Sequence, residues 1–503
     1  MTSSRPSDRL SAQDALFLYL DTQEMPLHIA SVMVFDGPIP LRECTELIRS
    51  RLPLIPRYLQ RIAVPPLNVG HPTWEFDPEF DIRRHVTEIA LKKGTEHELQ
   101  VLVGKVLSAQ MDRSRPLWDL TLVNGLKGGR GAMIARVHHC LVDGVAGVAL
   151  MNVLLGPTPS TPPPPKAKTP SPPLPDPITS FFDGLISSYA DMFGRVFQVQ
   201  SAAINMAESM VSEGVPALTQ LLQTIPDLLN PVDRLPFNQP CPGPRRLVWT
   251  EIAIPDVKKI REKFGGTLND VVLTLVIAAV REYTQLHGQA VDKRLARVMV
   301  PVNIRHESPL NGLGNHISMI PASLPLDIED PVELLANIHK RMDLMKRARV
   351  ADLVSLVGTW LGVTPVPVQA LLVPFATSML PALVPPFNLV CTNVPGPPVP
   401  LYALGRKMIS DYPYVPVGAD MGICVAIQSY NDKLFFGFTG SEAAAPDVNL
   451  MPRMLERIFA QLRRAAGVRT VRLRKPRAKK PAEPEPAPVP VSVAATVVHP
   501  TAA

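Results

Sequence analysis

The chain of 503 residues is poor in cysteine and has no paired cysteine motif. It contains five cysteines, and no two of them form a CxxC pair: Cys44, Cys140, Cys241, Cys391 and Cys424. An odd number of widely spaced cysteines argues against a disulfide framework and against a zinc site built on cysteine pairs. The cysteine pattern therefore favours a reducing, cytoplasmic setting.

Long uninterrupted hydrophobic runs are also missing. The first residues lack the apolar core of a signal peptide, so export is not indicated. The stretch between Asp352 and Arg406 carries no charge, but prolines interrupt it. A membrane-spanning helix needs about 20 apolar residues with intact backbone hydrogen bonds. We expect a soluble protein with a large apolar region that is either buried or in contact with lipid.

Positive charge is scarce outside one segment. Residues 463–480 hold nine Lys or Arg and no acid, whereas the net charge of the whole chain is +6. The rest of the chain is therefore mildly acidic, which argues against general nucleic-acid binding. The basic segment itself is suited to an anionic surface, and we expect no nucleic-acid partner.

Proline is abundant and clustered. The chain has 56 prolines, and its 46% hydrophobic against 19% charged residues excludes wholesale disorder. Eleven of the 21 residues from 157 to 177 are proline, which is typical of a polyproline-II spacer. The proline-rich tail after Arg474 is predicted to be disordered. Either segment could also serve as a ligand for a partner protein, but a spacer is the simpler interpretation.

Hydrophobic periodicity predicts a mixed α/β chain in two halves. Strands are predicted over 29–35, 120–123, 132–137, 247–254 and 296–302, and helices over 41–51, 97–109, 145–155, 267–286, 331–349 and 451–464. Residues 178–229 are mainly helical in pattern and either pack on the body or face lipid. The predicted organisation is an N-terminal half (1–155), a proline-rich linker (156–177), a helical connection (178–235), a C-terminal half (236–466) and a basic tail (467–503).

The sharpest local motif is the segment RVHHCLVDGVAG, residues 136–147. A predicted apolar strand runs directly into His138 and His139, and Asp143 and Gly144 then open a helix. A histidine at a strand end is held rigidly and can titrate near neutral pH. An acid at a helix start can cap the helix or hold a cation, and a glycine permits close backbone approach.

Three interpretations of the histidine pair compete: a structural pair in a core, a metal site, and one histidine acting as a general base. Adjacent residues of a strand point to opposite faces, so the two rings would rarely share one ion. No glutamate stands at helical spacing to complete a metal site. These two observations weigh against a metal site, but the residues of this segment alone do not decide among the three interpretations.

The same segment matches the HHxxxDG motif of the CoA-dependent acyltransferase superfamily, which includes chloramphenicol acetyltransferase and peptide-synthetase condensation domains. Further segments, in order, resemble the bacterial wax ester synthase/diacylglycerol acyltransferase branch: SAQDALF at 11–17, PLHI at 26–29, PLW from Pro116 to Trp118, ND at Asn269 and Asp270, VPVNIR ending at Arg305, GNHIS at 314–318 and NVPGP at 393–397. The resemblance covers residues 10–465. The proline-rich insert and the long tail depart from it.

This resemblance implies a fold of class α/β (α+β) with two chloramphenicol-acetyltransferase-like domains, each a mixed sheet with helices, joined by the proline-rich and helical connection. It also implies acyl transfer from acyl-CoA to the hydroxyl of diacylglycerol or of a long-chain fatty alcohol, which makes triacylglycerol or wax ester. By motif position, His139 is the general base and His138 supports its loop.

The remaining site residues follow from the same resemblance. Asp143 is implied to be structural and to pair with an arginine, for which Arg305 is the candidate. Asn269 could donate a hydrogen bond to the developing oxyanion or serve helix capping and packing. Substrate binding or structural support is implied for Gly144, Asp270, Pro116 and Trp118. No metal and no bound cofactor are implied, since acyl-CoA is a substrate.

Two other functions stay open at this point. One is acyl transfer from a carrier protein in lipid assembly, and the other is an inactive lipid-binding scaffold. The basic segment and the apolar connection further predict peripheral association with the inner face of the membrane or with lipid droplets.

Overall fold

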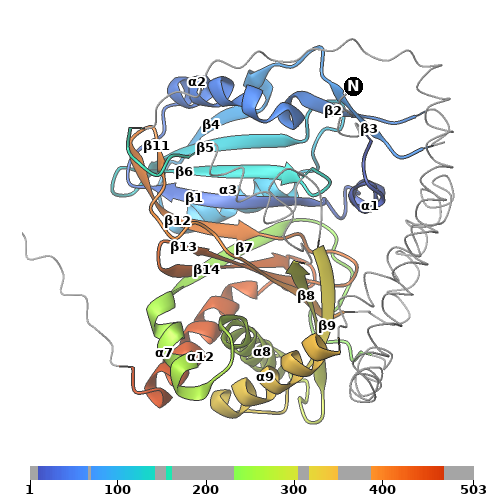
Figure 1. Ribbon diagram of the computed structural model, residues 1–503, viewed down its shortest axis with the longest axis vertical. Coiled ribbons are helices and arrows are strands. Elements are labelled where there is room, and N and C mark those ends of the chain that lie inside the picture. The colour runs from blue at the N-terminus through green and yellow to red at the C-terminus, as the bar shows by residue number, and fades with distance from the viewer. Residues whose placement is uncertain are drawn as a thin grey trace, which may run out of the picture. The chain divides into compact units, whose positions relative to one another are not determined.

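Two six-stranded mixed sheets dominate the molecule (Figure 1). The computed structural model describes residues 9–65, 70–141, 155–160, 232–303, 317–348 and 387–468. Contacts between residues group the chain up to Val468 into one unit. The predicted helices over 145–155 and 178–229 lie outside the described residues, apart from Leu155.

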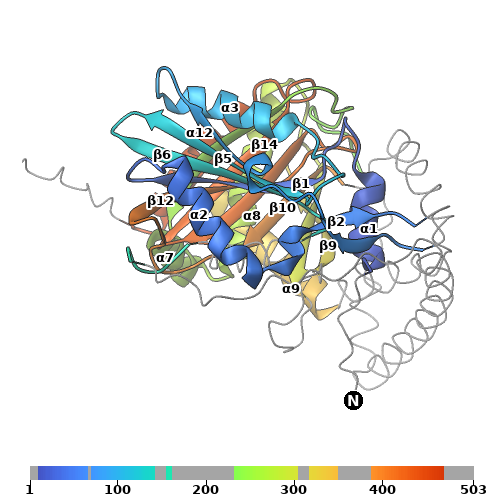
Figure 2. The same ribbon diagram turned by 90° about the horizontal axis from the view of Figure 1, so that it is seen from above.

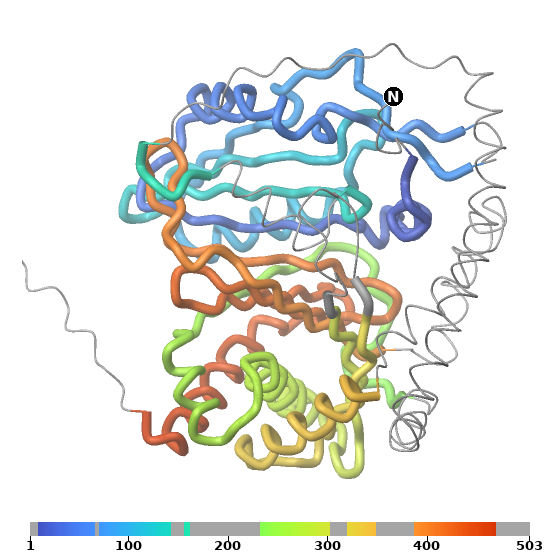
Figure 3. Tube along the Cα trace, in the orientation of Figure 1, coloured from blue at the N-terminus to red at the C-terminus, as the bar shows by residue number. Residues whose placement is uncertain are grey.

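The N-terminal sheet has the order β11-β12-β1-β6-β5-β4. Its strands are β1 (His28–Phe35), β4 (Val86–Ala90), β5 (Trp118–Leu126), β6 (Arg130–His138), β11 (Tyr402–Ala403) and β12 (Arg406–Tyr414). Strand β1 pairs antiparallel with β6 on one side and with β12 on the other (Figure 3). Two strands from the C-terminal part of the chain thus complete the sheet that carries the histidine motif. A small hairpin-like pair, β2 (Gln60–Ala63) and β3 (Thr73–Phe76), lies outside it.

The C-terminal sheet has the order β7-β14-β13-β10-β8-β9. Its strands are β7 (Arg245–Ala253), β8 (Leu295–Asn303), β9 (Ile317–Pro325), β10 (Leu389–Val394), β13 (Ile423–Tyr430) and β14 (Lys433–Ser441). Strand β10 pairs parallel with both β13 and β8, and the other neighbours are antiparallel. The predicted fold class, two mixed sheets with helices, is confirmed.

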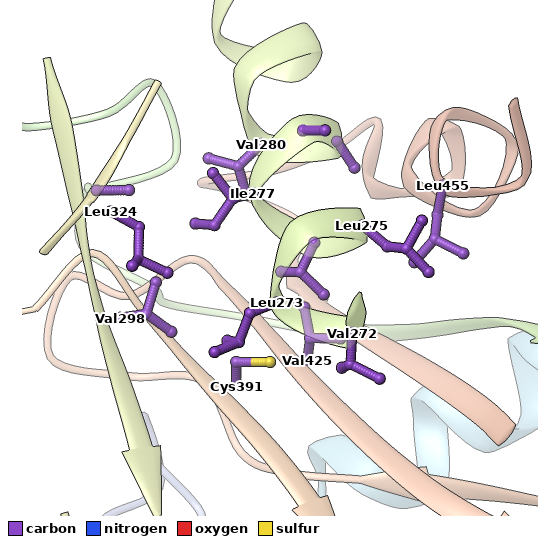
Figure 4. Close-up of a cluster of buried hydrophobic side chains, with 14 of the residues drawn as sticks. Val272, Leu273, Leu275, Ile277, Val280, Val298, Leu324, Cys391, Val425 and Leu455 are labelled. Carbon is purple, nitrogen blue, oxygen red and sulfur yellow. The ribbon is translucent and has the colours of Figure 1, made fainter. Parts of the chain in front are cut away.

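The C-terminal sheet is packed against a layer of helices. These are α7 (Ile254–Phe264), α8 (Leu268–Leu286), α9 (Pro331–Arg347) and α12 (Met451–Ala465). Helix α8 begins at a capping box, in which Thr267 and Asp270 satisfy each other's backbone N–H groups. Its apolar side chains are buried between the sheet and α9 and α12 (Figure 4). This arrangement makes α8 the central element of the largest hydrophobic core.

The N-terminal sheet carries helices on both faces. Helix α2 (Leu41–Arg51) packs in one cluster with Met33 and Phe35, and α3 (Glu96–Ser108) packs in another with Val32 and Val34. Alternate residues of a strand point to opposite faces, so the two helices lie on opposite sides of β1 (Figure 2). The third helix, α1 (Ala12–Leu20), lies beside the C-terminal end of β6 (Figure 1).

The two sheets meet through α3 and through β12. The backbone N–H of Arg245 in β7 donates to Ser108 Oγ at 2.7 Å, and Trp249 Nε1 donates to Glu96 at 2.7 Å. Gly437 in β14 faces β12 so closely that a Cβ there would collide with the carbonyl oxygen of Pro413. Glycine at this position therefore permits the close approach of the two sheets.

No single helix in the described ranges is long and apolar enough to cross a membrane. Among the helices of these ranges, one pair, α7 and α8 taken together, reaches that length and composition, and the two are bent by 98° at the break between them. The side chains of α8 are mostly buried in the core of the C-terminal sheet.

Candidate active site

The histidine pair stands where β6 ends and a turn begins. The backbone N–H of His138 donates to Leu117 O at 3.0 Å, and that of His139 donates to Leu27 O at 2.9 Å. The turn closes with Leu141 N–H donating to His138 O at 3.0 Å. The backbone is thus held by the residue before β5 on one side and by the residue before β1 on the other, which fixes the directions of both rings.

The His138 side chain is only 1% exposed and is enclosed by the protein. Its Nδ1 accepts a hydrogen bond from Cys140 N–H at 3.1 Å, so the ring proton sits on Nε2. Nε2 faces the carboxylate of Asp21 at 3.7 Å. Burial lowers the pKa of His138, and the charge of Asp21 opposes this only in part. His138 is accordingly a neutral, buried imidazole at neutral pH.

The His139 side chain has a different environment from that of its neighbour. It is half-buried, and its ring stacks on Phe17 of α1 with centroids 3.9 Å apart and an interplanar angle of 9°. Stacking fixes the ring plane, while partial exposure leaves the ring accessible. A rigid, accessible imidazole can accept a proton from a bound hydroxyl.

Asp21, at the end of α1, was not anticipated from the sequence. Its carboxylate, 2% exposed, accepts hydrogen bonds from Leu27 N–H at 2.8 Å, Gln110 Nε2 at 2.7 Å and Arg113 at 2.7 Å. Burial raises the pKa of Asp21, but His138 and the hydrogen bonds from Leu27 and Arg113 lower it by more, so the pKa lies well below its ordinary value. No local motif reveals this site, because only the β1–β6 register brings Asp21 to His138.

The PLW segment lies directly beside the histidine strand. Leu117 provides the carbonyl that holds His138, and Trp118 pairs with Val137 in the sheet. Trp118 is 5% exposed, donates from Nε1 to Tyr58 O at 2.8 Å and stacks on His85. Pro116 is buried next to it. These are the contacts of a packed core that supports the end of β6.

The ND segment opens α8 in the other half. Asp270 is fully buried and accepts from Thr267 N–H at 2.8 Å and from His339 Nδ1 at 2.9 Å. Asn269 Oδ1 accepts a hydrogen bond from Asn393 Nδ2 at 3.4 Å. Asn393 begins the NVPGP segment, so two segments far apart in sequence meet at the junction of α8 and β10.

Three predicted site residues, Asp143, Gly144 and Arg305, lie outside the described residues. The proposed pairing of Asp143 with Arg305 therefore stays a prediction. Within the described ranges, no group of three or more His, Cys, Asp or Glu side chains could hold a metal ion.

Two family models match the chain. The wax ester synthase/diacylglycerol acyltransferase catalytic domain matches residues 10–272, and the WS/DGAT C-terminal domain matches residues 313–463. Two probable diacylglycerol O-acyltransferases of Mycobacterium tuberculosis are similar over nearly the whole chain. The one called tgs1 is 28% identical and covers 90% of this chain and 96% of its own. The one called tgs2 is 26% identical and covers 92% and 100%.

Solved structures give the same result. The wax ester synthase/diacylglycerol acyltransferase from Marinobacter aquaeolei VT8 superposes with a TM-score of 0.65 and 26% identity, over 92% of this chain and 100% of its own. A starter condensation domain of rhizomide synthetase, at 12% identity and a TM-score of 0.55, over 91% of this chain and 94% of its own, shares the fold. The chain therefore belongs to the wax ester synthase/diacylglycerol acyltransferase family.

Proposed function

We propose that this protein transfers a fatty acyl group from acyl-CoA to the hydroxyl of diacylglycerol or of a long-chain fatty alcohol, with His139 as the general base. The observation that carries the assignment is the contrast between two adjacent rings. His138 is buried with Nδ1 and Nε2 both directed at protein groups, whereas His139 is half-buried and fixed by Phe17. Of the two motif histidines, His139 is therefore the one able to meet a substrate.

The reaction is a direct transfer between two bound substrates. An alcohol is a weak nucleophile, and an imidazole with an ordinary pKa of about 6.5 can take its proton as the oxygen attacks the thioester carbonyl. The tetrahedral intermediate then collapses, the C–S bond breaks, and the proton on His139 passes to the departing thiolate. The products are an ester and free CoA. The mechanism needs no covalent acyl-enzyme, metal or bound cofactor.

The other motif residues are assigned supporting roles. Asp143 fixes the motif loop by pairing with Arg305 from the C-terminal half, and Gly144 permits close approach of the loop backbone. Asn269 is suited to donate to the developing oxyanion from its amide nitrogen, since its Oδ1 is already turned toward Asn393.

Release of CoA from palmitoyl-CoA, measured with diacylglycerol or hexadecanol as acceptor, tests this function. We expect release that depends on the acceptor, and His139→Ala should reduce kcat by about 10²- to 10⁴-fold. His97→Ala, the same substitution on the exposed face of α3, is the matched control and should retain full activity. Full activity in His139→Ala would contradict the assignment.

The same assay separates the alternatives. Transfer only from a phosphopantetheinyl carrier, with no use of palmitoyl-CoA, would indicate the carrier-dependent branch. Lipid binding without turnover by the wild type with every donor would indicate a scaffold. The better of the two acceptors decides between triacylglycerol and wax ester as the product.

We further propose a cytoplasmic protein attached peripherally to the inner face of the membrane or to lipid droplets. Both acceptors are insoluble in water, and the basic segment 463–480 offers charge for an anionic surface. Lys and Arg near such a surface contribute about 1 kcal/mol each. Arg463 is partly committed elsewhere, since its Nε lies 3.0 Å from Asp256 on α7, so the attraction rests on the residues that follow.

Removing the residues after Ala466 tests this attachment. Binding to phosphatidylglycerol vesicles should weaken, and the loss should shrink as salt is raised. Phosphatidylcholine vesicles serve as the uncharged control. Unchanged binding of the shortened chain to anionic vesicles would contradict the proposal.

A further inference from the structure

The carboxylate of Asp21 lies at the centre of the contacts that surround the histidine turn. We propose that Asp21 is a positioning residue that fixes the orientation of His139 through His138 and Leu27. This inference rests on the proposed role of His139 and deepens it. Three separate connections run from Asp21 to the turn.

The first connection passes through His138. Nε2, which carries the ring proton, lies 3.7 Å from the Asp21 carboxylate, a distance that is too long for a hydrogen bond but short enough for a charge–dipole interaction in a buried site. On the other side of the ring, Nδ1 accepts from the backbone N–H of Cys140 at 3.1 Å. Asp21 thus favours the one tautomer of His138 that can hold the backbone immediately after His139.

The second connection passes through Leu27. Its N–H donates to Asp21 at 2.8 Å, and its carbonyl oxygen accepts from the N–H of His139 at 2.9 Å. The backbone is therefore held on both sides of the His139 ring: Leu27 accepts from the N–H of His139, and His138 accepts from the N–H of Cys140. Both holding groups are directed by the same carboxylate.

The third connection is α1 itself. The N–H of Asp21 donates to Phe17 O at 3.1 Å and ends the helix that presents the Phe17 ring to His139. The guanidinium of Arg113 donates to Leu18 O at 2.9 Å, to Asp21 O at 2.8 Å and to the carboxylate at 2.7 Å. Arg113 is thereby both the C-terminal cap of α1 and the counter-ion of Asp21.

These contacts go beyond what a stabilising ion pair needs. A buried carboxylate with a cation and two N–H donors would already be satisfied by Arg113, Gln110 and Leu27. His138, which faces the carboxylate, is not required for that balance, and its Nδ1 accepts a hydrogen bond within the turn. A misplacement of about 1 Å at a reacting group can cost about 10²-fold in rate, so this network should appear in kcat.

The test is a double-mutant cycle with Asp21→Ala and His138→Ala, measured as kcat and KM for palmitoyl-CoA. We expect each single variant to lose about 10- to 100-fold in kcat with KM changed by no more than about 2-fold. The double variant should be no slower than the slower single variant, because both act through the same turn. Losses in kcat that multiply in the double variant would overturn the proposal.

A matched control is Asp447→Ala in the other half. Asp447 also faces a histidine, His287, at 3.2 Å, and it also accepts a hydrogen bond, from Tyr283. We expect Asp447→Ala to lower Tm without changing kcat. A kcat loss in Asp447→Ala equal to that in Asp21→Ala would show a general effect of stability and would contradict the proposal.

Two further measurements keep the result decisive. Asp21→Asn keeps the shape of the side chain, removes the charge and serves if the alanine variant does not fold; we expect it to lose at least 10-fold in kcat. Nitrogen-15 spectra of the histidines, assigned by loss of signals in His138→Ala and His139→Ala, report the turn without turnover. We expect the His138 signals to shift in Asp21→Asn. Unchanged signals would overturn the positioning role of Asp21, and this result does not depend on whether His139→Ala is active.

Discussion

The two halves of this acyltransferase use buried groups in opposite ways. At the end of β6, buried positions are occupied by the titratable residues Asp21, His28 and His138, and the contacts of Asp21 and His138 lead to the histidine turn. Around α8, most buried positions are occupied by apolar side chains that fill the space between the C-terminal sheet and two helices (Figure 4).

The polar groups near β6 thus fix the orientation of side chains, whereas the apolar core around α8 provides stability. Apolar packing contributes large amounts of free energy but has little directional preference, whereas hydrogen bonds in a buried network fix particular atoms at a smaller net gain. Substitutions in the α8 core should therefore change the free energy of unfolding, and substitutions of the polar groups that hold the histidine turn should change the rate of acyl transfer.

The largest expected stability effect is in the α8 core. Leu275 is fully buried and points toward Leu455 of α12 (Figure 4), so Leu275→Ala leaves a cavity and should cost about 2–5 kcal/mol in the free energy of unfolding. Leu286→Ala is the matched control, since Leu286 lies in the same helix but is 57% exposed, and it should cost far less. Urea unfolding of both variants measures this, and equal losses would contradict the packing account.

A second effect depends on pH and lies at the junction of the two sheets. Asp411 of β12 is fully buried between Ser31 of β1 and Gln428 of β13, and burial raises its pKa to about 6 despite the Ser31 hydroxyl, which lowers it. A raised pKa means that folding favours the protonated acid, so the wild type loses stability as the pH rises from about 4 through 6. An asparagine side chain at this position would have the same shape as aspartate but would carry no charge that has to be buried.

The free energy of unfolding of Asp411→Asn should therefore increase relative to that of the wild type as the pH rises, by up to about 3 kcal/mol above pH 7. Thermal unfolding of both proteins at about pH 5 and pH 8 measures the change. For Asp112→Asn we expect the opposite: this variant should lose stability relative to the wild type as the pH rises, because hydrogen bonds from Ser114 lower the pKa of that exposed carboxylate. A Tm difference for Asp411→Asn that stays constant with pH would contradict the assignment.

The smallest effect concerns the support of β6. Trp118→Phe removes the Nε1 hydrogen bond to Tyr58 O while keeping an aromatic ring beside His85, and it should cost about 1–3 kcal/mol because the carbonyl is left unpaired in a buried site. We expect kcat to change by less than 3-fold, which steady-state assays can resolve. A large loss of kcat with an unchanged Tm would assign Trp118 a role in the reaction.

The sequence predicted best those helices and strands whose own residue pattern determines their secondary structure. Helix α2 begins and ends where predicted, and the predicted strands at β1, β6, β7 and β8 and helices at α3, α8, α9 and α12 differ from the structure by at most two residues at either end. Strong 3.6-residue or alternating patterns determine these elements. The histidine motif likewise placed His138 at the end of a strand.

Long-range pairing could not be predicted in the same way. Strand β12, for example, contains Asp411 and Pro413, which are disfavoured in strands, and it forms through pairing with β1 and β11 and close approach to Gly437 of β14. The contacts between Asp21 and His138 and between Asn269 and Asn393 also depend on sheet register and on the meeting of distant segments. Such pairs leave no local signal, and neither pair was identified in advance.

The most direct test of the account measures kcat for acyl transfer and the free energy of unfolding on the same preparations of two variants, His139→Ala and Leu275→Ala. We predict that His139→Ala loses at least 10²-fold in kcat while its stability changes by less than about 1 kcal/mol. We predict the reverse for Leu275→Ala, which should lose about 2–5 kcal/mol in stability while its folded fraction keeps the wild-type kcat. If both variants lost activity only in proportion to their stability, the separation of catalytic turn and structural core would be wrong.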